Sequence, residues 1–229
     1  LSLRELESLI ASITYPPVRA STLAELSSYC ESPESDDLAR QALEIVKTEC
    51  AVNEQAQAIG EIIPVLSEPV LFQALSIFQT FEDSKARSTL LVKACRRFAA
   101  LKDFIRASTL LQDIQHPEDQ VRAILQIADV APKSMQSSLI QEAVRLLPSV
   151  QDMDASLELV GELAKHASSL SASELLRLWC ETLHRQASQD RPTVLRNIQA
   201  LLPLAHALLR HDPAPSMASN LRLVSKWWP

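Results

Sequence analysis

Apolar residues recur along this chain at spacings of three and four positions, and nothing alternates convincingly between apolar and polar residues. This spacing matches the turn of an α-helix and not the two-residue period of a strand. The pattern therefore predicts helices from end to end. The clearest stripes are Val121, Ile124, Leu125 and Ala128; Phe104, Ala107, Leu111 and Ile114; and Ile198, Leu201, Leu202, Ala205, Leu208 and Leu209.

Prolines and capping residues indicate where these helices begin. Proline is tolerated in a first turn, where its missing N–H has no partner to lose. Pro16, Pro33 and Pro117 stand at such places, and Ser32 and Asp83 are candidate N-caps. The expected helices are 2–13, 16–30, 34–49, 52–66, 69–81, 83–100, 102–114, 117–130, 134–147, 152–168, 172–187, 192–209 and 216–227.

Two such helices with their loops take about 36 residues, a length typical of helical repeats. Short segments also recur, since 18–23 read VRASTL and 105–110 read IRASTL. In both copies we expect the apolar residues to pack inward, the small alanine to allow close helix approach and the arginine to point outward.

We therefore expect an all-α protein, a right-handed superhelical solenoid of about six helical hairpins, HEAT-like or tetratricopeptide-like (TPR-like). Residues 1–229 are expected to form a single helical-repeat domain, with 192–229 as its C-terminal capping region. A helical bundle is the alternative architecture, but bundles use fewer and longer helices.

Composition narrows the choice of function. Only 2 of 229 residues are glycine. Phosphate-binding loops and tight β-turns need glycines, so this composition excludes Rossmann, P-loop and β-sandwich folds. The net charge of −6 does not favour nucleic acid as a partner. No apolar run approaches a membrane span. The four cysteines lie far apart, which fits a reducing compartment, and we expect a cytoplasmic location.

Candidate catalytic and metal-binding groups find simpler explanations. Cys180 and His184 share a helix face, but no source for two further metal ligands is apparent. The carboxylate pairs at 36–37, 82–83 and 118–119 stand near expected helix starts, where negative charge complements the helix dipole. No catalytic residue, metal ligand or cofactor-binding residue is therefore assigned, and we expect no enzyme activity.

Two features are candidates for partner binding. The most basic stretch holds Lys93, Arg96, Arg97, Lys102 and Arg106, which together could receive an acidic partner or a phosphate-bearing ligand. A solvated helix corner is the simpler alternative for it.

The second feature is the C-terminal pair Trp227 and Trp228, directly before Pro229. Either tryptophan could anchor a partner. The alternative is a plug that covers the last hydrophobic layer of a solenoid.

The chain resembles one known group of proteins. The LLPLA segment at 201–205, the terminal KWWP at 226–229, the repeated Val-Arg-Ala starts and the IADVAP segment at 127–132 resemble the C-terminal helical repeats of bacterial, especially cyanobacterial, STAND-type (NACHT-like) signalling ATPases. In that family an effector and an ATPase precede the superhelix, which acts as the sensor. The resemblance implies that this chain, which begins with Leu1, is a fragment that follows such domains.

The helical repeats lead us to expect a non-catalytic recognition module. The resemblance implies that it is the ligand-sensing domain of a STAND-type defence ATPase and that it binds a protein partner. One alternative is a stand-alone scaffold or adaptor of HEAT or TPR type. The other, a helical-repeat enzyme such as a lyase, would need a deep pocket with strongly perturbed titrating groups.

Overall fold

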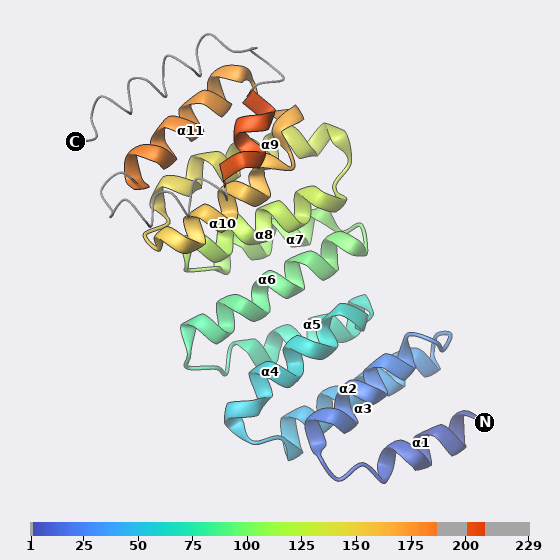
Figure 1. Cartoon of the computed structure of the whole chain (residues 1–229). Coiled ribbons are helices and arrows are strands. Elements are labelled where there is room, and N and C mark those ends of the chain that lie inside the picture. Colours follow the sequence, from blue (N-terminus) through green and yellow to red (C-terminus); the bar gives the residue numbers. More distant parts are fainter. Residues whose placement is uncertain (1, 187–200, 209–229) are drawn as a thin grey trace. The chain divides into compact units, whose positions relative to one another are not determined.

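The structure is a computed structural model that describes residues 2–186 and 201–208. Within these ranges the secondary structure consists of helices, which confirms the all-α prediction (Figure 1). The expected helix at 216–227 and most of the one at 192–209 lie outside the described residues. The chain divides into two compact units, residues 1–131 and 132–229. The expectation of a single repeat domain with a capping region at 192–229 stays a prediction.

The described residues of the first unit, 2–131, form eight helices and two short 3-10 turns. They are α1 (Leu3–Ala11), α2 (Pro16–Ser27), α3 (Glu34–Glu49), α4 (Val52–Ile62), η1 (Ile63–Val65), α5 (Glu68–Phe78), α6 (Ser84–Ala100), α7 (Phe104–Leu110), η2 (Leu111–Asp113) and α8 (Pro117–Val130).

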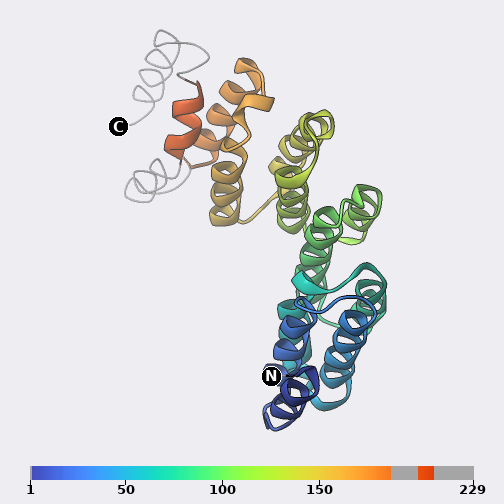
Figure 2. The ribbon, with the colours of Figure 1, turned by 90° about the vertical axis from the view of Figure 1, so that its right-hand side faces the viewer.

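Helices of the first unit contact both their neighbours in sequence and the helix after next. Along one row α2 contacts α4, α4 contacts α6 and α6 contacts α8; α3 and α5 contact each other outside this row. Consecutive pairs such as α2 with α3 and α6 with α7 join the two sets. The order of these helices along the unit can be followed in two perpendicular views (Figures 1 and 2).

The second unit is described at residues 132–186 and 201–208. It contains α9 (Lys133–Leu146), η3 (Leu147–Ser149), α10 (Met153–Ala164), η4 (Ala167–Ser169) and α11 (Ala172–Gln186), and residues 201–208 are helical. Trp179 and Leu178 of α11 are buried, as is Leu201. Leu202, expected on the apolar stripe with Leu201, is 55% exposed, so that assignment was wrong.

The helix starts follow the local chemistry of the sequence. Asp83 caps α6 by accepting hydrogen bonds from the backbone N–H groups of Lys85 (2.8 Å) and Ala86 (3.3 Å). Pro117 occupies the first position of α8. Ser32, however, does not cap α3; Pro33 holds the N-cap position without a side-chain hydrogen bond.

In the described residues four α-helices are followed by a 3-10 turn, and the expected helices 52–66, 102–114 and 152–168 run into such a turn. After each turn one apolar residue is extended and buried. These residues are Leu66 after η1, Ile114 after η2, Val150 after η3 and Leu170 after η4. Each anchors the connection to the next helix in the core, so the loops of this chain contribute to its packing.

The two recurring hexapeptides have the same local structure. Ala20 and Ala107 are fully buried, as expected for close helix approach. Val18 and Ile105, expected to pack inward, are instead 46% and 83% exposed, so that expectation was wrong.

The arginines of the two hexapeptides do not simply point outward either. Arg19 of α2 pairs with Glu49 at the end of α3, and Arg106 of α7 pairs with Glu68 at the start of α5. Each arginine therefore forms an ion pair between two helices, α2 with α3 for Arg19 and α7 with α5 for Arg106.

Candidate interaction surface

The structure separates the five residues of the predicted basic patch into different roles. Lys93 of α6 donates a hydrogen bond from Nζ to the carbonyl oxygen of Gly60 in α4 (2.9 Å). A Cβ atom at position 60 would lie 2.7 Å from that Nζ, so the absence of a side chain there allows the close approach. Lys93 is thus engaged in joining α6 to α4.

Arg97 is also engaged within the fold. Its Nε donates to the carbonyl oxygen of Leu66 (2.7 Å) and its Nη2 to that of Val65 (3.3 Å), at the C-terminal end of η1. Unpaired carbonyls at a helix end carry partial negative charge, which the guanidinium complements. Burial lowers the pKa of Arg97 from its ordinary value.

The same kind of contact occurs elsewhere after a 3-10 turn. Gln120 donates from Nε2 to the carbonyl oxygen of Ile114 (2.6 Å), and Arg185 donates to that of Val150. The buried extended residue after the turn thus receives a side-chain donor in each of these three places, which satisfies its backbone acceptor.

The remaining members of the basic patch are more accessible. Arg106 bonds Glu68, lies 3.0 Å from Oδ2 of Asp103, and places its guanidinium carbon 4.5 Å from the ring centroid of Phe72. Arg96 and Lys102 are exposed, and within the described part of the chain neither forms an ion pair. The patch therefore offers Arg96 and Lys102 to solvent, while Lys93, Arg97 and Arg106 are held by other groups.

Lys102 also has an unusual backbone. Its φ of 68° places it in the left-handed region, one residue beyond the C-cap of α6. The backbone N–H of Lys102 donates to the carbonyl of Ala99, and the backbone N–H of Asp103 donates to the carbonyl of Phe98. This pair of hydrogen bonds is the Schellman pattern of a helix end. Glycine is the usual residue at this position, and a chain with two glycines uses lysine instead. The other two predicted binding residues, Trp227 and Trp228, lie outside the described residues.

A different surface emerges on the row that contains α2, α4 and α6. Two furrows lie along it, one on each side of α4. The furrow between α4 and α6 has a volume of about 450 Å³ and that between α2 and α4 about 270 Å³. Gln57 and Glu61 of α4 line both furrows. We call the two furrows together the α4 groove.

Acidic and apolar side chains share the walls of the α4 groove. Tyr15 and Val18, 50% and 46% exposed, line the α2 side. The hydroxyl of Tyr15 donates to Oε1 of Glu54 (3.0 Å), which raises the pKa of Tyr15, and Gln57 donates to Oε1 of Glu61 (3.1 Å). On the α6 side the groove is lined by Asp83, Lys85, Ala86, Thr89, Leu90 and Lys93.

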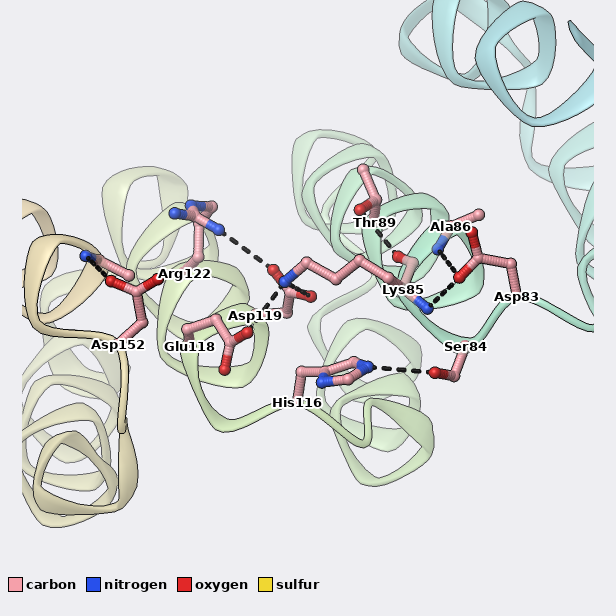
Figure 3. A network of polar contacts seen from close by, with 11 residues as sticks. Asp83, Ser84, Lys85, Ala86, Thr89, His116, Glu118, Asp119, Arg122 and Asp152 are labelled. Carbon is pink, nitrogen blue, oxygen red and sulfur yellow. Dashed lines mark hydrogen bonds and ion pairs between the residues drawn. The ribbon is translucent and has the colours of Figure 1, made fainter. Parts of the chain in front are cut away.

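A network of charged groups borders the groove where α6 and α8 begin (Figure 3). Asp119 of α8 has a side chain only 3% exposed, and it accepts hydrogen bonds from Nζ of Lys85 (3.0 Å) and Nη1 of Arg122 (3.1 Å). Nζ of Lys85 also bonds Oε1 of Glu118 (2.9 Å). Nearby, the Ser84 hydroxyl and Nε2 of His116 are 3.3 Å apart.

The pKa values of Lys85 and Glu118 in this network are shifted toward their charged forms. Burial alone would lower the pKa of Lys85, but its hydrogen bonds to Glu118 and Asp119 outweigh burial and raise it. Likewise burial would raise the pKa of Glu118, while the hydrogen bond from Lys85 lowers it. The carboxylates at 118 and 119 thus lie in the first turn of α8, as the sequence predicted for a helix start, and they also pair α8 with α6.

Among the residues that the structure describes, no cluster of three or more histidine, cysteine, aspartate or glutamate residues is arranged to hold a metal ion. All four cysteines are unbonded, and burial raises the pKa of Cys95 to about 12. None of the helices in the described ranges combines the length and apolar character needed to cross a membrane.

The α4 groove was not identified from the sequence. The spacing of Glu54, Gln57 and Glu61 by three and four residues indicates that they share one exposed face of a helix. That this face lies beside those of α2 and α6 follows only from the stacking of helices far apart in sequence.

Comparisons with known proteins gave no relative for this chain: no family model, no curated protein and no solved structure matched it.

Proposed function

We propose that this chain is a non-catalytic helical-repeat recognition module, a right-handed HEAT-like or TPR-like solenoid that binds a segment of a partner protein in the α4 groove. The observation that carries the proposal is the groove itself, which runs on both sides of one helix and has polar and apolar walls. Stacked helical repeats typically present such extended surfaces to a partner.

Two features support a repeat architecture. Contacts between every second helix, from α2 through α8, are the pattern expected when hairpins stack on one another. The recurring hexapeptides share a buried alanine and an arginine that reaches another helix. Their threonines also match, since Thr22 and Thr109 each donate to the carbonyl four residues earlier.

Binding rather than catalysis is favoured by the way the polar groups are used. Lys85, Glu118 and Asp119 satisfy one another, and Lys93 bonds a backbone carbonyl. A general acid or base needs a titrating group that is free to exchange a proton with a substrate. The other carboxylates of the groove also accept hydrogen bonds within the fold: Glu54 from Tyr15, Glu61 from Gln57, and Asp83 from the backbone of α6.

A peptide-display selection against the purified chain tests this function. Thr89→Trp should fill the furrow between α4 and α6, because Thr89 is exposed and lines it. Thr48→Trp on α3 is the matched control, since Thr48 is also exposed and also donates to the carbonyl four residues before it.

We expect the selected peptides to bind the wild-type chain and the T48W variant and to lose binding to T89W. Peptides that bind T89W as tightly as the wild type, or the enrichment of no peptide at all, would contradict the proposed groove.

The resemblance to STAND-type ATPases supports a more specific proposal, that the module is the ligand sensor of such a protein in the cytoplasm. In that setting binding would shift the protein between two states by differential affinity. Sequencing the coding region upstream of Leu1 tests it. An upstream ATPase with a G-x-x-x-x-G-K-[S/T] motif is expected, and its absence would leave a stand-alone adaptor.

A further inference from the structure

The chemistry of the α4 groove also indicates what kind of segment it accepts; this inference rests on the function proposed above. Three carboxylates line the groove: Glu54, Glu61 and Asp83. Within the described part of the chain none of the three forms an ion pair. Glu54 and Glu61 accept only uncharged donors, from Tyr15 and Gln57.

The two lysines of the groove do not neutralise these carboxylates. Lys85 bonds both Glu118 and Asp119, and Lys93 donates to the carbonyl of Gly60. Their side chains are therefore directed to other groups. At the border of the groove Glu118 and Asp119 are offset by Lys85 and Arg122, so the acidic character of the groove comes from Glu54, Glu61 and Asp83. A surface whose carboxylates are not paired with cations attracts positive charge and repels negative charge.

Apolar surface lies directly beside this charge. Tyr15 and Val18 are about half exposed on the α2 wall, next to Glu54. A ligand that is only a cation would leave them in water. A segment that places an aliphatic side chain next to a basic one can cover both.

We propose that the α4 groove binds a basic segment of a partner protein, in which lysine or arginine side chains meet Glu54 and Glu61 and a neighbouring aliphatic side chain covers Tyr15 and Val18. Nucleic acid does not fit, because its phosphates would meet these carboxylates. A second copy of the chain fits poorly as well, since the chain has a net charge of −6.

Three fluorescein-labelled peptides of equal length test the inference by anisotropy titration. One alternates lysine with leucine, the second replaces each lysine by glutamine, and the third replaces each lysine by glutamate. We expect the lysine peptide to bind at least about tenfold more tightly than the glutamine peptide and the glutamate peptide not to bind. We also expect the affinity of the lysine peptide to fall as salt is raised.

Charge variants of the chain show whether the groove is responsible. Glu61→Lys should weaken the lysine peptide by about tenfold or more, and Glu61→Gln by less. Glu44→Lys is the matched control, because Glu44 is exposed on α3, away from the groove residues, and the substitution changes the net charge equally. Circular dichroism of each variant verifies that it is folded.

The outcomes separate this inference from the function on which it rests. If the glutamine or glutamate peptide binds as tightly as the lysine peptide and T89W abolishes that binding, the groove is a docking site but the basic occupant is wrong. Equal losses in E61K and E44K would also overturn the inference, because the attraction would then be general. If neither these peptides nor the display selection yields a groove ligand, the proposed function itself fails.

Discussion

Replacement of Arg97 by methionine should destabilise the first unit, although the sequence suggested a surface role for this residue. Its Nε lies 2.7 Å from the carbonyl oxygen of Leu66, a residue with no exposed surface, and its Nη2 lies 3.3 Å from that of Val65. Methionine keeps most of the apolar stem and removes both donors.

The size of the effect follows from this geometry. A hydrogen bond to a charged group contributes about 1.5–3 kcal/mol, and the loss leaves a buried carbonyl without its donor. The longer hydrogen bond to Val65 adds little to this stabilisation. The burial that lowers the pKa of Arg97 also disfavours its charged form, which offsets part of the stabilisation from the hydrogen bonds. We therefore expect R97M to lower the free energy of unfolding by about 1.5–3 kcal/mol.

Urea unfolding followed by far-ultraviolet circular dichroism measures this difference. With an m-value of about 2 kcal/mol/M the midpoint should fall by about 0.7–1.5 M. Arg96→Met is the matched control, because Arg96 is the adjacent residue and is exposed, so its replacement should change stability by less than about 0.5 kcal/mol. Equal midpoints for R97M and R96M would refute the assignment of Arg97 to the end of η1.

Three further predictions concern other parts of the structure. Lys102→Gly should raise the free energy of unfolding by about 0.5–1 kcal/mol in the same urea assay, because the relief of strain at a positive φ exceeds the entropy that glycine adds to the unfolded chain; a loss of stability would contradict it. Iodoacetamide at pH 8, followed by peptide mass spectrometry, should label exposed Cys180 well before Cys95, whose thiol is buried with its pKa raised to about 12; early labelling of Cys95 would be inconsistent with that burial. The pKa of Glu118 is lowered in the folded state, so its contribution to the free energy of unfolding is present above about pH 4.3 and is lost as the pH falls through the folded value. The difference in free energy of unfolding between the wild type and Glu118→Gln should therefore shrink on acidification, and a constant difference would argue against the ion pair.

Much of the fold follows from local sequence patterns. The helices expected at 34–49 and 117–130 have the same bounds as α3 and α8. There the apolar stripe, a proline at the helix start and acidic residues in the first turn all agree.

The 3-10 turns were missed for a physical reason. Their residues continue the helical pattern of apolar spacing, so 52–66 appeared to be one helix. The buried, extended Leu66 becomes apparent only when the core that receives it is known.

The binding surface could be predicted only in part. Lys93, Arg96 and Arg97 are close in sequence, but Lys93 and Arg97 donate to backbone carbonyls about thirty residues away, in α4 and at the end of η1. Local spacing does not contain that information, because it depends on which helices stack. The spacing of Glu54, Gln57 and Glu61 indicates an exposed face of α4, but for the same reason it does not indicate that this face lies in a groove.

Hydrogen–deuterium exchange of the chain with and without a display-selected peptide tests the central claim most directly. The account predicts that a saturating peptide slows exchange in α4 and in the first half of α6, residues 52–62 and 84–93, which line the α4 groove. Slowed exchange confined to α3 and α5, or none at saturation, would contradict the claim that this chain recognises its partner through that groove.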